Sequence, residues 1–171
     1  WYWQLGDEPA LLIGGTDDDN LFQWTGKELT DHLDLLVSVG GNYVRNTMSD
    51  RDEGNVYAFT EVGEGKYDLS QWNDEYWNRL TFFLIETAKR GIVAQLTLWD
   101  QFDLGTSRWP VHPWNPENNV NLEPGSRTGR EIFYGTVASD DREGLRYQEQ
   151  FVRKIVEAAL VSGNVLFNIN N

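Results

Sequence analysis

Hydrophobic residues recur at helical spacing in three segments of the chain, and each segment ends at a glycine that precedes a short apolar run. The segments run from Glu28 to Gly40, from Asp74 to Gly91 and from Arg142 to Gly163. Apolar side chains at i, i+3, i+4 and i+7 mark one buried face of a helix, and glycine is the preferred residue just after a helix ends. The pattern therefore predicts three amphipathic helices.

The apolar run after each of these glycines has the length and composition of a β-strand. The predicted strands are Asn42 to Thr47, Ile92 to Trp99 and Asn164 to Asn171, with an earlier one at Ala10 to Gly14. Strands that alternate with helices favour right-handed βαβ units and a parallel sheet. We also expect a hairpin between Tyr2 to Leu5 and Ala10 to Ile13 across Gly6-Asp7.

Long segments follow the strands, whereas the connections from helix to strand are short. The longest are Ser49 to Asn73 and Asp100 to Asp141. In parallel α/β folds the loops at the carboxyl ends of the strands carry the functional groups. We therefore expect the site among the polar and aromatic residues that close the strands, including Asp17, Asn46, Trp99 and Asp100.

Composition narrows the classes of partner. The 171 residues carry a net charge of −13, which disfavours nucleic acid and anionic membranes as partners. The chain lacks cysteine, so disulfides and thiolate chemistry are excluded. It begins with Trp1 and not with methionine, which suggests that a leader or other N-terminal residues were removed. We expect a secreted or periplasmic protein.

Two strand motifs resemble those of a known enzyme clan. Gly41-Asn42-Tyr43-Val44-Arg45 is similar to the second-strand signature of clan A glycoside hydrolases, which include family 5 cellulases and apiosidase-like enzymes. The closing run from Gly163 to Asn171 looks like the fourth strand of that clan, in which an asparagine directly precedes the acid/base glutamate. The resemblance also covers the N-terminal hairpin and Leu21 to Trp24. Trp99-Asp100 stands where family 5 enzymes commonly have a histidine.

The resemblance implies a (β/α)8 TIM-barrel fold, of which residues 1–171 would form the N-terminal half of the catalytic domain. Residues 1–14 would supply a hairpin and first strand, and residues 25–171 the remaining units, giving about four βα units in all. It also implies retaining hydrolysis of O-glycosidic bonds by two carboxylates on strands four and seven. Both carboxylates would lie beyond Asn171, so these residues would supply walls and supports of the site.

The resemblance assigns supporting catalytic roles to Arg45 and Asn171. Arg45 would hydrogen-bond the nucleophilic carboxylate and keep it ionised, although an ordinary buried ion pair is the alternative. Asn171 would hydrogen-bond the 2-hydroxyl of the sugar, with a solvated strand end as the alternative.

The remaining candidates are predicted to bind the substrate. They are Trp99, Asp100, Trp24, Asp17, Asn46 and Trp114. Indole faces stack on sugar rings, but each tryptophan fits a core or a loop anchor equally well. A second enzyme hypothesis pairs Asp100 with Asp17 for acid/base work.

The acidic runs and the histidines are assigned no metal-binding or catalytic role. Asp17 to Asn20 and Asp50 to Gly54 lack the ligand spacing of a calcium loop, so no metal is assigned and both are interpreted as charged surface segments. His32 and His112 have no evident triad or metal partner in the sequence and are interpreted as structural or surface residues. No cofactor is predicted, because phosphate loops and dinucleotide fingerprints do not occur in the sequence.

These observations favour a polysaccharide-degrading glycosidase that binds an oligosaccharide or polysaccharide. Two alternatives remain open. One is a non-catalytic carbohydrate-binding barrel, and the other is a half-barrel that self-associates to cover its edge strand. The expected protein partner is accordingly the remaining half of the barrel or a second copy of the chain.

Overall fold

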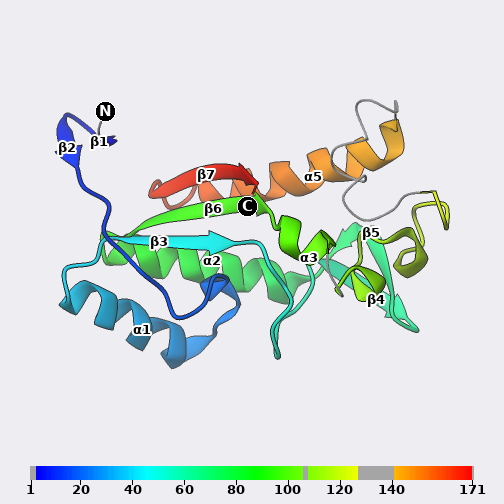
Figure 1. The fold of residues 1–171 in the computed structure, drawn as a ribbon, viewed down its shortest axis with the longest axis horizontal. Coiled ribbons are helices and arrows are strands. Elements are labelled where there is room, and N and C mark those ends of the chain that lie inside the picture. Colours follow the sequence, from blue (N-terminus) through cyan, green and yellow to red (C-terminus); the bar gives the residue numbers. More distant parts are fainter. Residues whose placement is uncertain (1–2, 106–107, 127–140, 171) are drawn as a thin grey trace.

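A three-stranded parallel sheet forms the centre of the protein in a computed structural model (Figure 1), which describes residues 3–105, 108–126 and 141–170. The strands lie in the order β3 (Tyr43–Thr47), β6 (Val93–Trp99) and β7 (Val165–Asn170). Helices α1 (Gly26–Ser38) and α2 (Asp74–Lys89) run alongside β3 and β6, and α5 (Arg142–Ala159) lies next to β7.

Smaller elements lie at the two ends of this sheet. Two antiparallel hairpins pair β1 with β2 and β4 with β5. The second hairpin lies beyond the carboxyl ends of β3 and β6 (Figure 1). The remaining bounds are β1 (Trp3–Leu5), β2 (Glu8–Ala10), η1 (Leu21–Gln23), β4 (Phe59–Gly63), β5 (Lys66–Trp72), α3 (Gln101–Gly105), η2 (Trp109–Val111) and η3 (Pro116–Asn118).

The three predicted helices are confirmed, with boundaries within a few residues of the expected ones. Asn73 caps α2 by accepting a hydrogen bond from the N–H of Glu75, and Asp141 caps α5 through the N–H of Gly144. Gly91 has a φ of +67°, the left-handed conformation that lets the chain leave α2 and enter β6. At the start of α1 the Thr25 side chain makes no capping hydrogen bond.

The prediction of a (β/α)8 TIM barrel with about four βα units is wrong. The described residues form one open three-stranded parallel sheet and two antiparallel pairs, not four consecutive βα units. The segment between β3 and α2 was interpreted as a loop, yet it folds into the β4–β5 hairpin around Glu64-Gly65. The helix-and-strand alternation that suggested a barrel therefore produces a smaller mixed α/β arrangement.

The strand expected at Ala10 to Gly14 does not form either. Glu8–Ala10 pairs with Trp3–Leu5, so the N-terminal hairpin uses an earlier second strand than expected. Residues 11–14 then pass beside the start of β3, where the Asn42 side chain accepts from the N–H of Ile13 and donates to the carbonyl of Leu11. These side-chain bonds take the place of a strand ladder, and Leu11 and Ile13 stay exposed.

The hydrophobic core lies between the sheet and its helices. α2 contributes Leu80, Phe83 and Leu84, and β6 contributes Ala94 and Leu96, all of them inaccessible to solvent. Burying a large aliphatic or aromatic side chain stabilises a fold by about 1.5–3 kcal/mol. The core therefore fixes the strands whose carboxyl ends carry the site. Among the described residues, no helix has the length and apolar character needed to cross a membrane.

Candidate functional site

Strand register places a row of polar side chains on one face of the parallel sheet. Successive side chains of a strand point to opposite faces, and Val44, Ala94 and Leu96 are fully buried in the core. The alternate residues share the other face, where Arg45 is paired in register with Gln95. We call this side, made of Tyr43, Arg45, Thr47, Gln95, Thr97 and Asn168, the polar face.

At the amino end of the strands, two side chains of the polar face hydrogen-bond each other. At the carboxyl end, the polar face meets an aromatic residue. The Tyr43 hydroxyl donates to Gln95 Oε1 at 2.8 Å. At the last position of β6, Trp99 is paired in register with Asn170 of β7. The Trp99 indole packs against Phe151 of α5 and Trp114, with ring centroids 5.2 and 6.1 Å apart. Hydrogen-bonding side chains thus line the sheet, and the half-buried indole of Trp99 lies at the carboxyl end of the row.

One arginine ties together the segments that follow the strands. Arg51 binds both carboxylate oxygens of Asp19 at 2.6 Å, and it also donates to Asp100 at 3.1 Å and to Asp103 at 3.2 Å. Asp103 further accepts from the Ser49 hydroxyl at 2.8 Å. Burial opposes the Arg51 charge, but the hydrogen bonds and charges of Asp19 and Asp103 raise its pKa. We call this group the Arg51 junction.

A small cavity lies beside the junction, at the carboxyl ends of β3 and β6. It has a volume of about 30 Å³, is partly open, and includes Asp50, Tyr76, Trp99, His112 and Trp114 in its lining. Since a water molecule needs about 10–15 Å³ on the same measure, there is room for roughly two water-sized groups.

An acid and an imidazole face each other across this cavity. Asp50 Oδ2 lies 3.7 Å from His112 Nε2, which is too long for a direct hydrogen bond. His112 Nδ1 accepts from the N–H of Trp114 at 3.2 Å, so the proton of the neutral ring is on Nε2 and points toward Asp50. Asp50 Oδ1 is buried and has no hydrogen-bond partner among the described residues.

Burial favours the neutral form of both of these groups. The pKa of Asp50 is raised well above its usual value by burial and by the neighbouring charges of Asp103 and Asp100, against which Arg108 acts. Burial, together with the charge of Arg108, lowers the pKa of His112 to about 3. The environment of the cavity therefore favours an uncharged acid and an uncharged imidazole.

The structure separates the predicted site residues into different environments. Trp99 and Arg45 lie on or beside the polar face, each partly exposed. Asn46 is fully buried on the opposite side, where its Oδ1 accepts from the N–H of Phe22. Asp100 is buried at the start of α3, where it accepts from the N–H of Phe102 and binds Arg51. Asn171 lies outside the described residues.

The other predicted contacts are also spread out. Trp24 donates to Asp18 at 3.4 Å and packs against His32, away from the cavity. Trp114 is buried within the aromatic group around Phe59. In place of the suggested Asp17–Asp100 pair, Asp19 is linked to Asp100 through Arg51.

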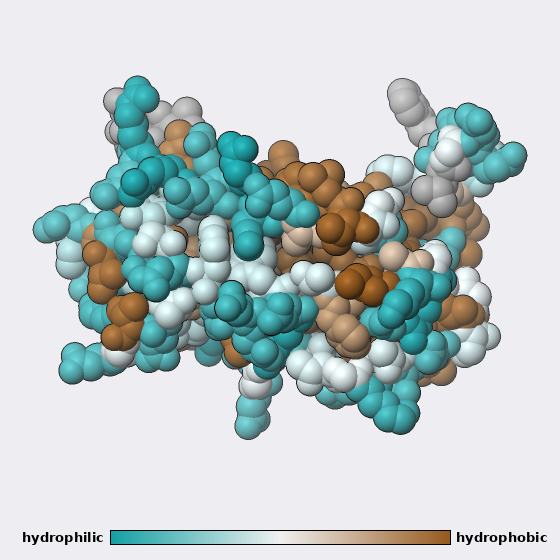
Figure 2. All heavy atoms as spheres, turned by 180° about the vertical axis from the view of Figure 1, so that it is seen from behind, coloured by the Kyte–Doolittle hydropathy of each residue, from teal (hydrophilic) through white to brown (hydrophobic). Residues whose placement is uncertain are grey.

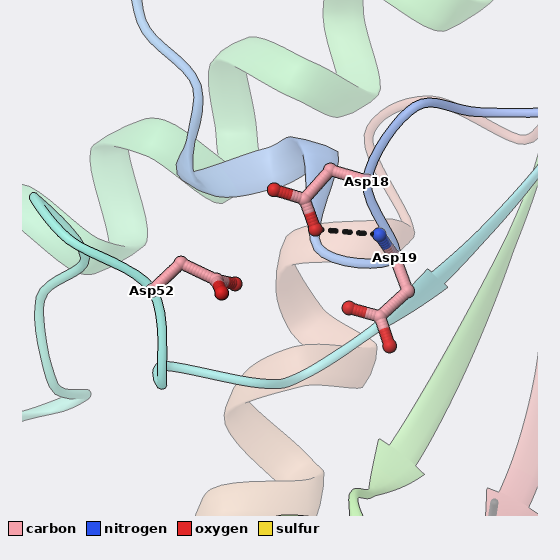
Figure 3. A group of neighbouring side chains, drawn as sticks. All are labelled: Asp18, Asp19 and Asp52. Carbon is pink, nitrogen blue, oxygen red and sulfur yellow. Dashed lines mark hydrogen bonds between the residues drawn. The ribbon is translucent and has the colours of Figure 1, made fainter.

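Two acidic residues after the N-terminal segment and one from the segment after β3 form a compact group of three carboxylates, shown in Figure 3. Asp18, Asp19 and Asp52 have oxygens within 4.8 Å of one another. Asp19 is already paired with Arg51, and Asp52 accepts from the Asn20 amide at 3.1 Å. Asp18 accepts from the N–H of Asp19 and from the Trp24 indole, so each of the three carboxylates already has a protein partner, and a cation at this place would have to compete with Arg51.

A second, wider hollow runs along α5 from Trp99. It has a volume of about 730 Å³, and most of the exposed surface of its lining is apolar, with Leu145, Val152, Val156 and Leu160 among the residues. Figure 2 shows hydrophobic surface in the middle of that view, over the region where α5 ends and β7 runs. Phe167 and Ile169 of β7 are also exposed. This apolar groove differs in character from the cavity, although Trp99 lines both.

Sequence reasoning missed Asp50, Arg51 and His112. The run from Asp50 to Gly54 was interpreted as a charged surface loop, yet Asp50 is buried and Arg51 joins three carboxylates. The only available signal was the mixed sign of the charges directly after a strand. His112 lies between Val111 and Pro113, and only the fold brings it to Asp50.

Comparison with models of protein families finds no match for this chain, and neither curated proteins nor solved structures give one. The resemblance to clan A glycoside hydrolases therefore remains a prediction from its motifs.

Proposed function

We propose that this protein acts on carbohydrate as a glycoside hydrolase, and that the carboxyl end of the parallel sheet binds the sugar. The observation that carries the proposal is the register pair of Trp99 and Asn170 at the end of the polar face. An indole face covers the apolar side of a sugar ring, while amides and guanidinium groups hydrogen-bond its hydroxyls. Arg45, Gln95 and Asn168 supply such groups on the same face.

The proposal depends on the carboxyl ends of the parallel strands and does not require a barrel. Ligands of parallel α/β sheets bind at the carboxyl ends of the strands, where the Arg51 junction fixes the loops around Trp99. The polar face carries no carboxylic acid among its described residues. It is therefore assigned to sugar recognition and support, while hydrolysis with retention needs two carboxyl groups about 5 to 5.5 Å apart.

Sugar binding is tested by titrating the protein with gluco-, galacto-, manno- and xylo-oligosaccharides in a calorimeter. Trp99→Ala should weaken binding at least tenfold, because stacking and ring burial are lost together. Trp3→Ala is the matched control, since Trp3 is exposed on the remote N-terminal hairpin. Equal affinities for both variants, or no binding of any sugar, would refute the proposal.

Hydrolysis is tested separately by following reducing ends and the anomeric configuration of the first product by NMR. Retained configuration supports the proposed two-carboxylate mechanism. Sugar binding without any product favours the second candidate function, a non-catalytic carbohydrate-binding protein. The observation in favour of that candidate is the lack of a carboxylic acid among the described residues of the polar face.

A further inference from the structure

Three polar groups around the small cavity have no hydrogen bond to any described residue. They are the buried Asp50 Oδ1, His112 Nε2 and the Tyr76 hydroxyl. The nearest approach is the 3.7 Å between Asp50 and His112. Tyr76 is otherwise a core residue, packed against Phe22 and Trp77. Buried polar groups are normally paired, so the unpaired Asp50 oxygen beside two further polar groups without protein partners points to a missing partner in this cavity.

The size of the cavity limits that partner to a small group. About 30 Å³ holds roughly two water-sized groups. A group placed between Asp50 and His112 can bond both, because 3.7 Å is within the span that one bridging oxygen covers.

The chemistry of the lining selects a neutral hydroxyl over an ion. His112 Nε2–H donates, the Tyr76 hydroxyl donates or accepts, and the Asp50 carboxyl accepts and, when protonated, also donates. A hydroxyl group can serve all three, since it both donates and accepts. An anion would face the charges of Asp100 and Asp103, which line the same cavity, and a cation would face nearby Arg108.

We propose that this cavity is a hydroxyl-binding site, filled by two ordered waters in the free protein and by the hydroxymethyl group of a hexose when a sugar stacks on Trp99. A hydroxymethyl group has two non-hydrogen atoms, which matches the room available. Trp99 lines the cavity, so a ring on its indole lies next to the opening. The sugar part of this inference rests on the proposed function, whereas the water part does not.

The water part is tested by a crystal structure of the free protein at a resolution that shows ordered solvent. Two waters within hydrogen-bond distance of the Asp50 carboxyl, His112 Nε2 and the Tyr76 hydroxyl are expected. An empty cavity, or one closed by a moved side chain, overturns the inference.

The sugar part is tested with a matched pair of oligosaccharides that differ only in the hydroxymethyl group, such as those of glucose and xylose or of galactose and L-arabinose. The hexose should bind about tenfold more tightly, and Tyr76→Phe should reduce that preference severalfold without changing pentose affinity. Tyr57→Phe is the control, because the Tyr57 hydroxyl accepts from Arg108 and Tyr57 does not line the cavity.

Equal affinity for the two sugars, or an equal loss for both in Tyr76→Phe, overturns the hexose preference while leaving sugar binding intact. Failure of every sugar to bind overturns the proposed function and the hexose preference together. The waters in the crystal then decide the hydroxyl site alone.

Discussion

Asp50 and Arg51 are neighbours in the chain, yet the polar groups around Arg51 are hydrogen-bonded to one another, whereas several of those around Asp50 lack partners. Arg51 is saturated with partners, since Asp19, Asp100 and Asp103 all accept from it. Asp50 faces a cavity in which its buried Oδ1 has no partner, and His112 Nε2 and the Tyr76 hydroxyl also make no hydrogen bond to a described residue. Satisfied buried networks rigidify a fold, while unsatisfied ones mark places where a ligand or water belongs. The junction therefore holds the loops, and the cavity is the region available for binding.

The strongest test of this contrast removes the centre of the junction. Arg51→Leu leaves Asp100 and Asp103 buried without their counterion, and we expect a loss of about 3–5 kcal/mol in the free energy of unfolding. Urea denaturation measures the loss. Lys27→Met is the control and should change little, because Lys27 and Asp31 form an exposed pair. A loss in Arg51→Leu no larger than in the control would mean that the junction does not hold the loops.

A second prediction concerns pH. Asp50 has a raised pKa in the folded protein, so its contribution to stability is present at low pH and is lost as pH rises above the unfolded value. His112, with a pKa of about 3, contributes in the opposite sense, with stability present above about pH 6.5 and lost as pH falls. Between about pH 4 and 6.5 the two slopes oppose each other.

Asp50→Asn removes the contribution of Asp50 to the pH dependence of stability and leaves that of His112. The variant should lose stability more steeply than the unmodified protein on acidification from pH 6.5 to 4, by up to about 1.4 kcal/mol per pH unit. Denaturation at a series of pH values measures both slopes. Parallel curves for the two proteins would show that Asp50 is not neutralised by burial.

The smallest expected effect is a difference in stability between two tyrosine-to-phenylalanine variants. The Tyr57 hydroxyl accepts from Arg108 at 3.1 Å, so Tyr57→Phe should destabilise the protein by about 1 kcal/mol. Tyr76→Phe should cost less than this, because its hydroxyl bonds no described residue and the proposed cavity waters can rearrange around the lost group. Thermal unfolding measures both. A larger loss in Tyr76→Phe than in Tyr57→Phe would indicate that solvent in the cavity is a tightly held part of the fold.

Local pattern was sufficient to predict the helices and the parallel strands of the centre. Leu80, Phe83 and Leu84 recur at helical spacing and are buried, and Gly91 ends the segment as expected. The same pattern did not justify the prediction of a barrel, which is wrong. The apolar run at Ala10 to Gly14 lacked a strand to pair with, since the Asn42 side chain bonds its backbone instead.

The sequence by itself determined the secondary structure of the centre, the acidic charge and the place of Trp99 at a strand end, because these depend on local spacing and composition. Only the tertiary structure decided that Arg51 joins Asp19 to Asp103, and that His112 meets Asp50 from 62 positions away in the chain. Such pairs depend on how long loops fold over the sheet, where burial and not sequence spacing decides which polar groups are paired and which remain open.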